Sequence, residues 1–219
     1  MTIDNNDLLN SILASLDRIK HISPDDIPDI DLYMDQVTTF MDNGLRDTVR
    51  YPGEDKILTK TMINNYAKND LLPPPVKKKY SKEHVLLLIF IYYYKGILSI
   101  GDIQKLLGPI TERFFKSSGS FNLESVYREA FGMEEAQIEV LKADVTEKFK
   151  TAEATFRDAP EDSREFLKKF AFICTLSFDV YIKRLLIEKL VDELAESSGA
   201  KAEDAGKKKS GKTGKPQEK

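Results

Sequence analysis

Side chains that bind metals or form disulfides are scarce in this sequence. Its 219 residues include one cysteine, Cys174, and two histidines, His21 and His84, while tryptophan is absent. A single thiol excludes an intramolecular disulfide, and so few thiols and imidazoles cannot assemble a zinc site. We therefore predict no bound metal and a cytoplasmic location. Cys174, next to Ile173, is expected to be a small buried apolar side chain, and the histidines are expected to form local hydrogen bonds.

Long apolar runs and catalytic motifs are also missing. The longest apolar run, Val85 to Tyr94, covers ten residues, whereas a membrane helix needs about 20. The N-terminus lacks the basic start and continuous apolar stretch of a secretory signal. No Gly-rich phosphate loop, Gly-x-Ser-x-Gly elbow or His-Glu-x-x-His motif occurs, and the acids between residues 25 and 31 fit helix starts better than a calcium loop. These absences argue against a membrane protein, an enzyme and a bound cofactor.

Charge is distributed unevenly, although the formal net charge is only -3. Residues 1–49 hold 3 Lys or Arg against 10 Asp or Glu, and residues 97–200 hold 14 against 19. Residues 50–96 have the opposite balance, 9 against 4. Between Lys56 and Lys82, seven lysines accompany one acid, Asp70. Such a segment suits a polyanion such as nucleic acid, although a lysine-rich turn can also be plain solvated surface.

Apolar residues recur every three or four positions through most of the chain, which predicts an all-α fold. The first half is expected to form helices over residues 8–19, 30–43 (stopped by Gly44), 60–69 (capped by Thr59), 82–95 and 99–107 (stopped by Gly108-Pro109). An apolar stripe from Ile138 to Phe156 and an apolar segment from Ser163 to about Glu196 predict two more, separated at Pro160. The run VLLLIFIYYYK is expected to pack in the core.

Between residues 59 and 95, a capped helix, a Leu-Leu-Pro exit, a short basic turn and an apolar helix follow one another. This order resembles the winged helix-turn-helix of MerR-type transcription regulators, in which a recognition helix precedes a basic wing and two packing helices. The matching residues are Ile63, Tyr66, Leu71, Leu72, Pro73, Tyr80, Ser81, Leu98, Ser99, Ile100 and Ile103. Here Asn64 replaces the arginine common on the recognition helix, Asp70 replaces the customary glycine, and residues 46–58 replace a tight turn.

Residues 28–108 also resemble an uncharacterised bacterial family, the domain of unknown function numbered 1836. The similarity lies in Ile30 to Val37, Leu58 to Tyr66 and Lys78 to Ser81. The chain then divides into an N-terminal amphipathic helix (1–27), a winged helix-turn-helix (28–108), a helical dimerisation or effector region (109–197) and a disordered lysine-rich tail (198–219) without large apolar residues. A homodimer is expected, because the helix from Ser163 to Glu196 is apolar on more surface than one neighbour can cover.

The resemblance and the lysines together predict a regulator that binds double-stranded DNA and that responds to an unidentified small-molecule or protein effector. The candidate DNA-binding residues are Thr59, Lys60, Thr61, Asn64, Asn65, Lys68, Lys77, Lys78, Lys79, Tyr80 and Lys82. Asn64 or Asn65 could pair with adenine in the major groove, while the lysines and threonines would hold phosphates. The alternative is a non-enzymatic interaction module whose basic turn binds an acidic protein partner and whose asparagines are ordinary helix surface.

Overall fold

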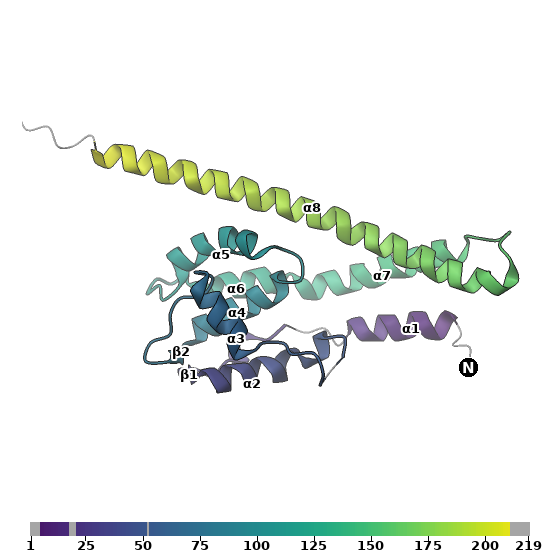
Figure 1. Cartoon of the computed structure of the whole chain (residues 1–219), viewed down its shortest axis with the longest axis horizontal. Coiled ribbons are helices and arrows are strands. Elements are labelled where there is room, and N and C mark those ends of the chain that lie inside the picture. Colours follow the sequence, from purple (N-terminus) through teal and green to yellow (C-terminus); the bar gives the residue numbers. More distant parts are fainter. Residues whose placement is uncertain (1–4, 18–20, 52, 211–219) are drawn as a thin grey trace, which may run out of the picture.

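The computed structural model describes residues 5–17, 21–51 and 53–210, and most of them are helical (Figure 1). The helices are α1 (Asn5–Leu16), α2 (Met34–Leu45), α3 (Lys60–Lys68), α4 (Lys82–Tyr94), α5 (Ile100–Phe114), α6 (Leu123–Gly132), α7 (Glu134–Glu153) and α8 (Glu161–Ser210), with 3-10 turns η1 (Pro24–Asp26) and η2 (Arg46–Thr48). Two short strands, β1 (Leu32–Tyr33) and β2 (Lys79–Tyr80), form a small antiparallel sheet. The predicted all-α class is confirmed apart from this sheet. In the described ranges, no helix has the length and apolar character that crossing a membrane requires.

Helix α4 lies in the main hydrophobic core. Its residues Val85 to Ile91 are all buried, and they form one cluster with buried residues of α2, α3, α5 and α6. Each large apolar side chain buried in this way stabilises the fold by roughly 1.5–3 kcal/mol. The Tyr127 hydroxyl of α6 donates a buried hydrogen bond of 2.8 Å to the carbonyl of Ile22, which joins the start of this region to its end. The predicted packing role of the run VLLLIFIYYYK is therefore confirmed.

The start of the second helix differs from the prediction. Instead of beginning at Ile30, the helix begins at Met34, and the two residues before it form β1. Tyr33, predicted to face inward, is 54% exposed. The strand exists because residues 32 and 33 pair with residues 80 and 79 of β2. Local periodicity does not report such a long-range partner, so the prediction of a helix here was wrong.

Two predicted helix stops lie inside helices. Helix α2 passes through Gly44, where a Cβ atom would lie 2.6 Å from Cδ1 of Ile22, so this glycine permits close packing rather than ending the helix. Helix α5 passes through Gly108-Pro109 and ends at Phe114. Leu107 is buried in the main core and Phe114 packs against it. Burial on both sides of the proline offsets the roughly 3 kcal/mol by which proline disfavours a helix interior.

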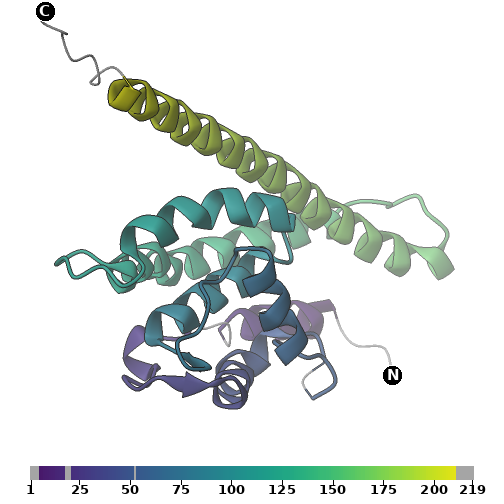
Figure 2. The same ribbon diagram turned by 60° about the vertical axis from the view of Figure 1, so that its left-hand side comes forward.

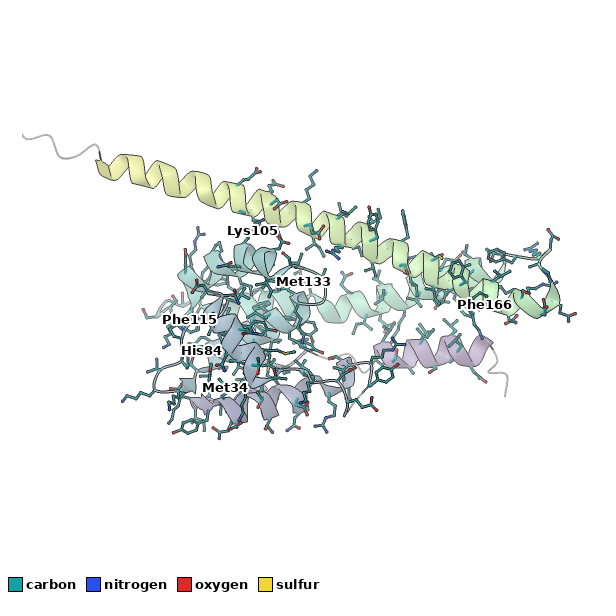
Figure 3. All side chains as sticks on the ribbon, viewed as in Figure 1. Met34, His84, Lys105, Phe115, Met133 and Phe166 are labelled. Carbon is teal, nitrogen blue, oxygen red and sulfur yellow. The ribbon has the colours of Figure 1, made fainter. Side chains whose placement is uncertain are left out.

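A second, smaller core joins α1, α7 and α8. Its buried residues are Val145, Phe149, Ala152 and Phe172, and residues of α1 pack against them. This burial accounts for the middle of the apolar stripe predicted from Ile138 to Phe156, and the break at Pro160 separates α7 from α8 as expected. Helix α8 also packs on α5, where Lys105 reaches Asp192 at 3.0 Å (Figure 3).

Helix α8 is longer than predicted and extends beyond the rest of the molecule (Figures 1 and 2). Expected to end near Glu196, it continues to Ser210, into the segment predicted to be disordered. Alanine and lysine favour a helix without burial, so a lack of large apolar residues does not stop it. Residues 211–219 of the predicted tail lie outside the described residues. Cys174, predicted to be buried, is exposed on α8, which has neighbours on one side only.

Candidate nucleic-acid interface

Hydrogen bonds define both ends of α3, the helix that resembles a recognition helix. At its start, Oγ1 of Thr59 accepts a hydrogen bond of 3.1 Å from the Met62 N–H, which confirms the predicted cap. At its end, Asp70 adopts a left-handed backbone with φ of 53°, and the Leu71 N–H donates to the Tyr66 carbonyl at 2.9 Å. This is a Schellman motif, whose left-handed position usually holds glycine. Asp70 therefore has the backbone role of the glycine that it replaces.

The outer face of α3 is polar and open to solvent. Ile63 and Tyr66 are buried, so the helix exposes the opposite side. That side, which we call the α3 face, carries Lys60, Thr61, Asn64, Asn65 and Lys68, all of them exposed. The spacing of one, four, five and eight residues from Lys60 keeps them on one side of the helix. Within the described ranges, neither the Asn64 nor the Asn65 side chain forms a hydrogen bond with the protein, so both amides are available to a ligand.

The predicted basic wing is a tight hairpin turn at residues 76–79. Val76 and Lys79 exchange two backbone hydrogen bonds of 3.1 and 2.9 Å, while Lys77 and Lys78 have positive φ angles of 51° and 64°. Two successive left-handed residues make a type I′ turn, for which Asn-Gly is the preferred sequence. A lysine in this conformation costs about 1 kcal/mol or more. Both lysines are exposed, so the strained turn displays two ammonium groups.

Tyr33 is a surface residue that sequence reasoning placed in the core. It pairs with Lys79 across the β1–β2 sheet, and the Lys79 ammonium lies 5.2 Å from the centre of the Tyr33 ring. Helix α2 contacts α3 and both strands, which brings the α3 face and the hairpin to the same end of the molecule (Figure 1). The signal that could have found Tyr33 is its position directly before a helix start, where a short strand often precedes the helix.

Two of the predicted lysines have carboxylate partners. The Lys82 ammonium lies 3.0 Å from Glu124 and 3.6 Å from Asp29, and only 21% of its side chain is exposed. Lys60 pairs with Asp35, yet 60% of its side chain is exposed. Lys68, Lys77, Lys78 and Lys79 have no carboxylate partner among the described residues. We therefore leave Lys82 out of the candidate interface and count four unpaired lysines in it.

Tyr80, another predicted contact residue, belongs to the core. It is 3% exposed and packs edge-on against His84, with ring centres 5.5 Å apart. His84 is itself buried beneath the hairpin, between Tyr80 and Phe115 (Figure 3). Its Nδ1 accepts a hydrogen bond of 3.0 Å from the Ser81 N–H, as expected of a histidine near a helix start. Burial lowers the pKa of His84, which keeps the imidazole neutral near pH 7.

The acidic residues before α2 do not form a metal centre. Among the described residues, no group of three or more His, Cys, Asp or Glu side chains is arranged to hold a metal ion. Asp25 instead pairs with Arg128, whose hydrogen bonds hold the pKa of the Asp25 carboxyl below its usual value. This ion pair links η1 to α6.

Residues 22–130 match the model of a family described as Domain of unknown function (DUF1836). The matched region begins just before η1 and includes the β1–β2 sheet, α2 to α5 and nearly all of α6. The resemblance predicted for residues 28–108 is thereby confirmed at the level of this family, and it extends further at both ends. No curated protein and no solved structure matches the chain. The family description assigns no activity, so the function has to be argued from the site.

Proposed function

We propose that this chain is a DNA-binding protein, a transcription regulator that uses α3 and the 76–79 hairpin as a winged helix-turn-helix. The observation that carries the proposal is the pair Lys77 and Lys78 in a type I′ turn. A sequence that served the turn alone would place Asn-Gly there, and strained backbone is retained most often at functional sites. Two exposed lysines at a strained tip are explained if they contact phosphates. A cytoplasmic location goes with this proposal.

The α3 face supplies what base reading requires. A helix fits the major groove, and an asparagine amide can donate to N7 and accept from N6 of adenine only if no protein group already uses it. Asn64 and Asn65 meet this condition, and Lys60, Thr61 and Lys68 flank them on the same face. In this arrangement the asparagines read bases, and the flanking residues and the hairpin hold the DNA backbone.

Base reading and backbone contact can be separated experimentally. Selection from random duplexes first gives a preferred site, and Asn64→Ala and Asn65→Ala are then compared with the wild type on that site and on an unrelated duplex. Loss of a base contact costs about 1–3 kcal/mol on the preferred site and little elsewhere. The control is Lys150→Gln with Arg157→Gln, two exposed cations at the end of α7 and in the loop that follows it.

The same experiment can refute the assignment. If both asparagine variants bind the preferred site as tightly as the wild type, α3 does not read bases. If selection yields no site and no duplex binds, the basic hairpin belongs to the alternative, a module for an acidic protein partner.

We also propose that a second copy of the chain covers α8. Half of the exposed large apolar residues in the described ranges lie on this helix. Phe170, Cys174, Phe178, Tyr181 and Leu185 recur at spacings of four and three and thus form one stripe, in which Phe178 is 63% exposed. Aromatic side chains carry about 150–250 Å² each, so the stripe and its neighbours approach the roughly 800 Å² that each partner of a stable dimer buries.

Light scattering tests this assembly. The wild type is expected to be a dimer at tens of micromolar, and Phe178→Glu is expected to be a monomer, because it places a charge in the stripe. Phe121→Glu is the matched control, since Phe121 is 53% exposed but lies outside α8. A monomeric wild type, or equal effects of the two variants, would exclude α8 as the dimer interface.

A further inference from the structure

A pocket of about 530 Å³ lies between the 46–58 connection and the C-terminal end of α4. This volume falls within the roughly 300–1,000 Å³ that is usual for small-molecule sites. Arg50 and Lys56 line it from the connection, and Tyr92 and Lys95 line it from α4 and its C-cap. The hairpin precedes α4, so the pocket and the hairpin lie at opposite ends of this 13-residue helix, about 20 Å apart.

The charge of the pocket is unusual for this chain. Arg50, Lys56 and Lys95 face a single lining carboxylate, Asp55, which accepts a hydrogen bond from the Tyr51 N–H at 3.0 Å. None of the three cations has a carboxylate partner in the described part of the chain, whereas five other lysines each contact two carboxylates: Lys82, Lys105, Lys142, Lys148 and Lys168. In a protein with more acids than bases, three unpaired cations therefore meet in one pocket.

One wall of the pocket is held in place by hydrogen bonds. The Lys95 ammonium donates to the Ile57 carbonyl at 2.8 Å and lies 4.7 Å from the centre of the Tyr92 ring. The Tyr92 hydroxyl lies 2.5 Å from Oγ1 of Thr48. One protein hydrogen bond leaves two N–H groups of Lys95 for a ligand. Partial burial lowers the pKa of Lys95, an effect that a bound anion would oppose.

We infer that this pocket binds a small anion with several negative charges, of the pyrophosphate or phosphate-ester class. The Arg50 guanidinium supplies paired donors that match two phosphate oxygens, while Lys56 and Lys95 add point charges. Pyrophosphate carries enough oxygens to engage all three cations, and the pocket has room for a larger organic group.

The position of the pocket connects it with α3. From Ile57, whose carbonyl holds Lys95, the chain passes through buried Leu58 to Thr59, the cap of α3. An anion that draws Lys95 away from Ile57 changes how this connection is anchored to α4. Binding of the anion stands without the proposed DNA function, and only its effect on α3 rests on that function.

Isothermal titration of the full chain with pyrophosphate tests the pocket. The wild type is expected to bind saturably, and Arg50→Gln with Lys56→Gln is expected to weaken binding at least tenfold, because two of three charge-assisted contacts are lost. These exposed residues make no core contact, and melting curves verify folding. The control, Lys150→Gln with Arg157→Gln, removes the same charge elsewhere and is expected to bind like the wild type.

The possible outcomes distinguish this pocket from the proposed DNA interface. No saturable binding by the wild type, or equal loss in the pocket variant and the control, overturns the inference. If the pocket variant lowers the salt dependence of duplex binding while the wild type binds no pyrophosphate, the cations contact the DNA backbone, and the inference is also overturned. Selective pyrophosphate binding without any duplex binding supports the pocket while the proposed function fails.

Discussion

Replacing the two lysines at the hairpin tip should stabilise the protein and weaken its DNA binding at the same time. In Lys77→Asn with Lys78→Gly, each residue suits its left-handed position in the type I′ turn. Relief of about 1 kcal/mol per lysine is partly offset by the greater freedom of glycine in the unfolded chain. We expect a net gain of about 1 kcal/mol, which corresponds to about 2–4 °C in melting temperature at this chain size.

The same variant should change the salt dependence of DNA binding by a known amount. Four unpaired lysines per subunit give eight phosphate contacts in a dimer and a slope of log K against log salt of about -7, because each contact contributes about -0.9. Losing two contacts per subunit brings the slope to about -4 on every duplex. Lys77→Ala with Lys78→Ala should change the slope equally without the gain in stability. A destabilised Asn-Gly variant, or an unchanged slope in both variants, would refute this reasoning.

Three further predictions concern α3, the buried histidine and the end of α8. Asp70→Gly should raise the free energy of unfolding by about 0.5–1 kcal/mol, measured in urea, because glycine adopts the left-handed backbone without strain; a loss of stability would contradict this. The unfolded state binds a proton near pH 6.5 and folded His84 binds it only at lower pH, so its contribution is complete above pH 6.5 and is lost below it, at up to about 1.4 kcal/mol per pH unit. His84→Gln, which can still bond the Ser81 N–H, should reduce the loss of stability between pH 7.5 and 5.5; an unchanged pH profile would refute this. Deleting residues 198–219 should leave the melting temperature and the dimer unchanged, as checked by calorimetry and light scattering, because this segment has no large apolar residue to bury.

Much of the fold is predictable because it depends on local signals. The cap at Thr59, the break at Pro160 and the burial of Val85 to Ile91 follow from residues adjacent in the chain. The errors arise where a distant partner decides. Leu32 and Tyr33 become a strand because β2 pairs with them, and Gly44 packs against Ile22 instead of ending α2.

The candidate site was predictable in composition but not in detail. The lysine segment and the α3 asparagines are visible in the sequence, and the structure exposes them on neighbouring elements. The sequence could not show that Glu124 engages Lys82 or that Tyr80 is buried, since both depend on packing between separate helices. The left-handed backbone at Lys77 and Lys78 was equally hidden, because lysine gives no hint of a type I′ turn.

The central claim is that the α3 face and the hairpin bind duplex DNA, and a salt titration of the wild-type protein tests it most directly. Binding to a labelled random-sequence duplex is measured between 50 and 200 mM salt. We predict a linear plot of log K against log salt with a slope of about -7. A slope near zero, or no binding at the lowest salt, would contradict the claim and assign the basic hairpin to an acidic protein partner or to plain solvation.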